Sequence, residues 1–147
     1  MARKEVQIDP RGYRFGAGVT LVGAIVAMLV GAPWPGDLVL AVLAVLFLPG
    51  ATIGPQVTLQ SFLFRTLIRP RIGKPTKTES FRPPRFAQQI GLVLSATGAV
   101  LGFAGFAWGV YVFGGFVLAA SFLNSVFGYC LGCEIYLALK RLTARPA

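Results

Sequence analysis

The chain contains no histidine, only two cysteines and only five acidic residues among its 147 residues. Without histidine, the usual haem ligand and the commonest general base are missing. The apolar stretches hold no paired carboxylates that could relay protons, and the sequence shows neither a nucleophile–base triad nor a glycine-rich phosphate loop. These absences argue against a haem protein, a proton-driven pump, a triad hydrolase and a phosphate-loop enzyme. We expect no bound cofactor.

Charged residues are also scarce, at 13%, whereas 55% of the residues are hydrophobic. Such a composition is typical of a membrane protein. Four apolar stretches are each close to the roughly 20 residues that cross a hydrocarbon core: residues 15–31, 38–54, 86–107 and 109–126. Because backbone polar groups must be paired inside lipid, these stretches are predicted to be helices. We therefore expect an all-α fold, a single membrane domain over residues 1–147 with four transmembrane helices, the second interrupted at Pro49.

The charged residues that are present are unevenly placed. Fourteen are basic and the net charge is +9. With four spans, all fourteen fall on one side of the membrane, before the first span, in the loop of residues 55–85 or after the fourth span. Positive charge marks the cytoplasmic side, so both termini and this loop are predicted to be cytoplasmic. Trp34 and Trp108 fall on the opposite side, at the depth where tryptophan favours the interface. Because the basic residues flank the spans, we expect contact with membrane lipids and not with nucleic acid.

The loop of residues 55–85 contains two different patterns. Thr58, Ser61, Arg65 and Arg69 recur at helical spacing, which predicts a helix at the membrane surface with its arginines toward water or phosphates. The following prolines predict an extended segment: Pro70, Pro75, Pro83 and Pro84. The candidate residues for binding lipid headgroups or a partner are Arg65, Arg69, Arg71, Arg82 and Arg85, and a solvated loop without a partner is the alternative.

Other segments predict how the helices begin and pack. Residues 9–12, with the sequence Asp-Pro-Arg-Gly, predict a turn before the first helix. Small residues at four-residue spacing in the third and fourth spans predict a close seam inside the bundle or an interface in a homo-oligomer. The segment from Cys133 to Leu142 predicts a short helix at the interface, with cations near its C-terminal end.

Both cysteines lie in one short segment, Gly128-Tyr129-Cys130-Leu131-Gly132-Cys133-Glu134. Two thiols at this spacing can close a disulfide, and one can resolve a mixed disulfide formed by the other. Metal binding is a second interpretation, although two thiolates and one carboxylate fall short of a zinc site and suit copper(I) better. The third interpretation is that both cysteines only pack. We place the candidate chemistry on Cys130 and Cys133, with no metal.

Four residues around the pair are candidates for a supporting role. Gly128, Tyr129 and Gly132 belong to the motif itself, and Asn124 lies one to two turns before it, at the edge of the fourth span. A polar side chain at that depth indicates either a functional site or an interhelical hydrogen bond.

The sequence resembles the bacterial family of small membrane proteins catalogued as domain of unknown function 4395. The segments that carry the resemblance are Asp9-Pro10-Arg11-Gly12, Arg69-Pro70-Arg71, Arg82-Pro83-Pro84-Arg85-Phe86-Ala87-Gln88 and Asn124-x3-Gly128-Tyr129-Cys130-x2-Cys133. Members of that family are often encoded near thioredoxin-like or rhodanese-type sulfurtransferase proteins. The resemblance therefore implies a location in a bacterial inner membrane and a soluble thioredoxin-like or rhodanese-type partner.

Together these observations lead to one hypothesis and two alternatives. The hypothesis is a cytoplasm-facing exchange of disulfides or sulfane sulfur through Cys130 and Cys133. One alternative is a non-catalytic accessory or assembly subunit of a membrane complex, whose small-residue faces bind another membrane protein. The other is a small transporter of a sulfur species, with Asn124 and the thiols at its inner mouth.

Overall fold

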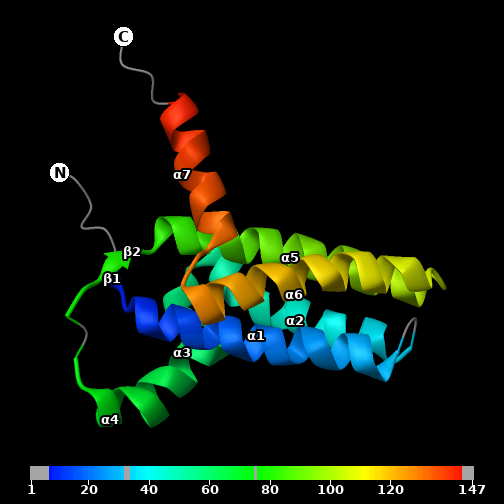
Figure 1. The fold of residues 1–147 in the computed structure, drawn as a ribbon, viewed down its shortest axis with the longest axis horizontal. Coiled ribbons are helices and arrows are strands. Elements are labelled where there is room, and N and C mark those ends of the chain that lie inside the picture. Colours follow the sequence, from blue (N-terminus) through cyan, green and yellow to red (C-terminus); the bar gives the residue numbers. More distant parts are fainter. Residues whose placement is uncertain (1–6, 32–33, 75, 144–147) are drawn as a thin grey trace.

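The computed structural model describes residues 7–31, 34–74 and 76–143, and its architecture is helical (Figure 1). Four helices form an up-and-down bundle: α1 (Pro10–Val30), α2 (Gly36–Thr52), α5 (Arg82–Phe103) and α6 (Ala107–Phe127). Around the bundle, α1 packs on α2, α2 on α5, α5 on α6 and α6 on α1. The last helix, α7 (Leu131–Thr143), projects away from the bundle axis. The all-α prediction is confirmed.

Three helices of the described chain are long and apolar enough to cross a membrane: α1, α5 and α6. The fourth, α2, is apolar but has only 17 residues, with Pro49 inside it. Each of the four predicted apolar stretches therefore forms a helix, and three of these helices have the length and composition of a span.

The bundle is packed inside and apolar outside. Leu40 of α2 and Val110 of α6 are fully buried, as are Ala24 and Ala27 of α1. Val45 of α2, in contrast, is exposed, in common with many other large hydrophobic residues on the outer faces of the helices. An outer surface of this kind suits hydrocarbon and not water.

Small residues lie where the helices approach one another. A Cβ atom added to Gly98 of α5 would lie 2.7 Å from a methyl group of Leu40, and one added to Gly91 would lie 2.8 Å from the ring of Phe47. Both distances are too short for a real contact. The small residues of α5 thus form the predicted seam inside the bundle, against α2.

The predicted turn at residues 9–12 is wrong, because α1 already begins at Pro10. Asp9 is the N-cap, and its Oδ1 accepts a hydrogen bond of 3.0 Å from the backbone N–H of Arg11. Proline suits the first helical position, because an N–H group there would have no acceptor within the helix. Burial by itself would raise the pKa of Asp9, but hydrogen bonds from Arg11 and the charge of Arg69 lower it overall. The ionised Asp9 thus stabilises the fold at neutral pH, and this contribution is lost as the pH falls through its lowered pKa.

The predicted extended proline segment is right only in its middle, because the described residues between α4 (Arg69–Ile72) and α5 form no helix, whereas both ends of the segment are helical. Pro83 and Pro84 lie in the first turn of α5, and Pro70 lies in the first turn of α4. The start of α5 accepts proline, because the first N–H groups of a helix have no partner within it. Pro70, in contrast, follows η2 (Phe64–Ile68) without a break in the helical segment. Pro75 lies outside the described residues.

Residues 55–72 are almost continuously helical, through η1 (Pro55–Val57), α3 (Leu59–Leu63), the π-helical turn η2 (Phe64–Ile68) and α4. The predicted surface stripe is only partly right, since Arg65 is exposed but Thr58 is buried. Thr58 instead caps α3 by accepting a hydrogen bond of 3.2 Å from the Ser61 N–H. Phe64 turns inward, against Gly12 of α1.

The two ends of the bundle differ. At one end, β1 (Gln7–Ile8) pairs antiparallel with β2 (Glu79–Ser80), next to the N-terminal ends of α1 and α5 and not far from α4 (Figure 1). At the other end α2 and α6 begin, so that Trp34 and Trp108 share this end. The C-terminus of α6, where α7 starts, therefore lies at the β1–β2 end.

Candidate functional site

The cysteine segment lies where α6 ends and the chain turns into α7. Gly128 has φ +69° and ψ 17°, a left-handed conformation that favours glycine. Its N–H donates to the Asn124 carbonyl at 3.0 Å, and the N–H of Tyr129 donates to the Leu123 carbonyl at 3.1 Å. These bonds satisfy carbonyl groups at the helix end, so that the turn is fixed locally.

Arg14 of α1 stabilises the same helix end from the neighbouring helix. Its guanidinium group donates to the carbonyl groups of Ser125 and Val126, both at 3.3 Å. A cation near the C-terminus of a helix interacts favourably with the helix dipole. Arg14 therefore connects the start of α1 to the turn that carries the cysteines.

Cys130 and Cys133 form a disulfide, with their Cα atoms 5.2 Å apart. Cys130 immediately precedes α7, and its carbonyl accepts from the Glu134 N–H at 3.0 Å. Its Sγ accepts from the Cys133 N–H at 3.1 Å. The sulfur atom thus takes the place that a serine or aspartate oxygen takes at an ordinary helix N-cap, and the predicted location at a helix start is correct.

A second polar group reaches the same sulfur atom. The hydroxyl oxygen of Tyr13, in the first turn of α1, lies 3.6 Å from Cys130 Sγ. Because a disulfide sulfur has no proton to give, the hydroxyl group is the donor. Cys130 Sγ therefore has two donors, whereas no hydrogen bond reaches Cys133 Sγ from the described part of the chain.

Close packing fixes α7 on α5. A Cβ atom added to Gly132 would lie 2.6 Å from both the Cα and the Cβ atom of Ala87. One turn further along, the rings of Phe86 and Tyr136 are 5.7 Å apart. Gly132 thus allows a backbone contact that no larger residue permits.

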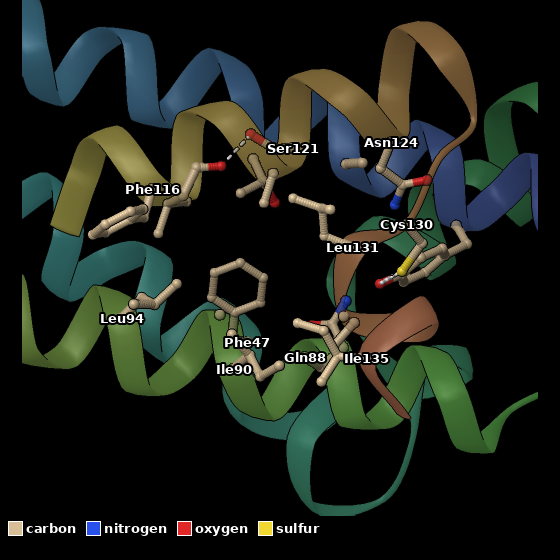
Figure 2. Close-up of a pocket in the computed structure, with 18 residues that line it drawn as sticks. Phe47, Gln88, Ile90, Leu94, Phe116, Ser121, Asn124, Cys130, Leu131 and Ile135 are labelled. Atoms are coloured by element: carbon tan, nitrogen blue, oxygen red, sulfur yellow. Dashed lines mark hydrogen bonds between the residues drawn. The ribbon is translucent and has the colours of Figure 1, made fainter. Parts of the chain in front are cut away.

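Behind the disulfide lies a cavity of about 340 Å³. Its walls come from α1, α2, α5 and α6, and the first turn of α7 covers it (Figure 2). Phe47, Leu94 and Phe116 line the apolar part, and Cys130 lies at the opposite end. Cys133 is not among the lining residues, so the two sulfur atoms differ in what they face.

Two amide side chains of the cavity lie on the same side of it as Cys130 (Figure 2). Asn124 is only 6% exposed, its side chain lies next to Cys130 in Figure 2, and it makes no side-chain hydrogen bond within the described chain. Gln88 also lines the cavity, and its Oε1 is buried without a partner among the described residues. Ser121 is satisfied, because its hydroxyl group donates to the Val117 carbonyl at 2.7 Å. No Asp, Glu, Lys or Arg lines the cavity.

The structure brings together only some of the residues that the sequence suggested. Asn124, Cys130 and Gly132 line the cavity, and Gly128 shapes the turn. Tyr129 is 47% exposed and does not line the cavity. No pattern in the sequence predicts a role at this site for Tyr13, Arg14 or Gln88. Tyr13 precedes the predicted first span of residues 15–31, and nothing in the sequence pairs it with a residue 117 positions away.

The five candidate arginines do not form one cluster. Arg65 donates to the Gln56 carbonyl at 3.3 Å, near Arg69 and Asp9, while Arg71 is exposed on α4. Arg82 and Arg85 lie at the start of α5, beside Tyr136. Arg85 also approaches the Ala51 carbonyl at 3.5 Å, at the C-terminal end of α2. Arg85 thus has a structural contact of its own.

No group of three or more histidine, cysteine, aspartate or glutamate residues within the described ranges is close enough to hold a metal ion. No curated protein and no solved structure matches the chain. A family model described as "Domain of unknown function (DUF4395)" matches residues 8–141, which include every helix of the bundle and the cysteine segment. A match of this extent establishes that the chain belongs to the DUF4395 family.

Proposed function

We propose that this protein exchanges disulfides between its Cys130–Cys133 pair and a soluble thioredoxin-like partner at the cytoplasmic face of a bacterial inner membrane. The observation that carries the proposal is the asymmetric setting of the disulfide. Cys130 Sγ has two hydrogen-bond donors and faces a cavity, whereas Cys133 Sγ has neither. An asymmetry of this kind gives the two sulfur atoms different roles in an exchange reaction.

The membrane arrangement in this proposal has four spans, with α2 as the shortest. An α-helix of 17 residues is about 25 Å long, at the lower limit for crossing a hydrocarbon core. Leu38, Val42, Val45 and Leu48 on its outer face are 44–67% exposed, which suits contact with lipid. The basic residues of α4 and of the start of α5 share the end of the bundle that carries β1 and β2, and the positive-inside rule makes that end cytoplasmic.

In the first step of the exchange, a partner thiolate attacks Cys133 Sγ. A partner–Cys133 disulfide forms, the Cys130–Cys133 bond breaks, and its electron pair leaves on Cys130 as a thiolate. The Cys133 N–H and the Tyr13 hydroxyl group already point at Cys130 Sγ, and the N-terminus of α7 adds a favourable dipole. A stabilised leaving thiolate leaves faster.

In the second step, another partner thiolate attacks the partner sulfur of the mixed disulfide. The partner becomes a disulfide, Cys133 is released, and the pair has gained two electrons and two protons overall. In the reverse direction, Cys133 attacks a partner disulfide and Cys130 resolves the adduct. Exposed arginines at this end, among them Arg65, Arg71 and Arg82, supply positive charge for an acidic partner surface or for anionic headgroups.

The assignment of roles is tested by trapping. In Cys130→Ser the resolving sulfur is missing, so mixed disulfides with partner proteins should accumulate on Cys133. Cys133→Ser should accumulate several-fold less, because Cys130 faces the cavity. Acid-quenched cells expressing each tagged variant are separated on non-reducing gels, and the adducts are identified by mass spectrometry. The double serine variant is the control, and a lack of adducts in both single variants would refute the exchange function.

Tyr13→Phe tests the donor to Cys130. One hydrogen bond contributes about 1 kcal/mol, so loss of the hydroxyl group should raise the pH of half-maximal alkylation of Cys130 by about 0.5–1 unit. The shift is upward because the hydroxyl group stabilises the charged thiolate and not the neutral thiol. The rate of iodoacetamide labelling is measured against pH in the Cys133→Ser background, where Cys130 is the sole thiol. Tyr129→Phe, at an exposed tyrosine one residue away, should leave the profile unchanged.

A further inference from the structure

We propose that the cavity behind Cys130 binds a neutral, lipid-soluble quinone, which exchanges two electrons with the Cys130–Cys133 pair. This inference rests on the proposed disulfide exchange and identifies the small molecule that completes it. Four features of the cavity support it: the polarity of the lining, the unpartnered amide, the opening to the outer surface and the cysteine at the polar end.

The lining selects a neutral ligand with one polar end. The volume of about 340 Å³ has room for a substituted ring and the first part of an attached chain, and most of its wall is apolar, including Phe47, Leu94 and Phe116. A charged ligand buried among these side chains would lack a counter-charge, because no Lys, Arg, Asp or Glu lines the cavity. Ionic lipids and inorganic anions are therefore poor fits.

The polar end is suited to hydrogen bonding in two chemical states. Asn124 is 94% buried, and its side chain has no hydrogen-bond partner in the described chain. An amide group donates to a quinone carbonyl and equally accepts from the hydroxyl group of a quinol. Gln88 is a second amide in the lining, but its Oε1 is buried against Gly50 of α2. A purely apolar occupant, such as a ring of elemental sulfur, would leave the Asn124 amide unsatisfied.

The cavity is reached from the lipid side of the bundle. Phe116 and Ile135 both line it, yet they are 57% and 47% exposed. Their outer surfaces belong to the apolar exterior of α6 and to α7, so the opening is bordered by residues that suit hydrocarbon. A ligand with an apolar tail can enter from the bilayer without crossing water.

The redox step balances with the quinone as oxidant. The two thiols of Cys130 and Cys133 lose two electrons and two protons, and the sulfur–sulfur bond forms. The two carbonyl groups of the quinone gain the same two electrons and two protons and become the hydroxyl groups of a quinol. Cys130 is the sulfur that meets the quinone, since it lines the cavity and Cys133 does not. The partner and the quinone thus approach opposite sides of one disulfide.

Quinone binding is measured separately from electron transfer in the double variant Cys130→Ser and Cys133→Ser, which has no thiols. The full chain is reconstituted in lipid nanodiscs. Decylubiquinone is titrated, and quenching of protein fluorescence is measured. Saturable binding is expected. Ala120→Phe, which fills the cavity, should weaken binding at least tenfold, and so should Asn124→Leu, which removes the amide. Ala119→Phe is the matched control, because Ala119 adjoins Ala120 on α6 but is exposed and does not line the cavity.

The electron transfer is measured separately, by quinol absorbance after decylubiquinone is added to the reduced chain with both cysteines. One quinol per dithiol is expected. Ala120→Phe should slow the formation of quinol at least tenfold. Mixed disulfides should still accumulate in the double variant Ala120→Phe and Cys130→Ser. The inference is overturned if quenching is equal and non-saturable in all variants, or if no quinol forms. If the quinone experiments fail but mixed disulfides with partner proteins are trapped, the proposed exchange function stands. If quinol forms but no mixed disulfide is trapped, only the exchange function is refuted.

Discussion

Replacing Gly132 by valine should lift α7 off α5 and increase the rate of chymotryptic cleavage after Tyr129 about 5- to 150-fold. The added Cβ atom would lie 2.6 Å from the backbone Cα atom of Ala87, and a backbone atom cannot rotate away. Overpacking of this kind costs about 1–3 kcal/mol. Since 1.4 kcal/mol is a factor of ten in population, and cleavage follows the population of the open form, the expected increase is about 5- to 150-fold.

The cleavage assay has a matched control on the same helix. Ala138→Val also places a valine on α7, but at an exposed position, and should leave the rate unchanged. The C-terminal fragment is quantified by mass spectrometry in nanodiscs. The disulfide itself should still form in Gly132→Val, because both cysteines belong to one turn. Equal cleavage of both variants would mean that α7 is not packed on α5 as described.

Leu40→Ala should lower the free energy of unfolding by about 2–5 kcal/mol. Leu40 is 0% exposed and packs against Gly98 at the centre of the bundle. Removing its branched end leaves a void that the surrounding helices can close only in part. The transition is followed by circular dichroism during titration of mixed micelles with a denaturing detergent.

Leu48→Ala is the control for this measurement, since it makes the same change on the same helix at a residue that is 48% exposed. Lipid or detergent chains can fill the space there, so the expected cost is about 0.5 kcal/mol or less. Similar losses for both variants would contradict the inward orientation of Leu40.

Much of the fold could be predicted because the bilayer imposes strong rules on a sequence. Length and hydropathy located every helix of the bundle, and the spacing of small residues such as Gly91 and Gly98 located the seam. The helix starts were missed for a local reason. Pro10, Pro83 and Pro84 were interpreted as breaks, although proline is well tolerated in the first turn.

The candidate site was predictable only in its local part. Cys130, Cys133 and Gly132 lie within one turn, so their spacing in the sequence determines how they lie relative to one another in the structure. The contacts of Tyr13 with Cys130, and of Arg14 with the end of α6, join residues more than 100 positions apart. Gln88 and Asn124 meet at the cavity only because α5 and α6 are adjacent. Such meetings depend on how helices rotate and pack, which a single sequence does not specify.

The disulfide closes a ring of only four residues, from Cys130 to Cys133. In the chain-entropy description, so short a loop restricts the unfolded chain by about 2 kcal/mol, compared with about 4.7 kcal/mol for a loop of 100 residues. The bond therefore holds no distant parts of the chain together. Opening or closing it should thus leave the surrounding helices in place, so that the fold of the bundle does not depend on the redox state of the cell.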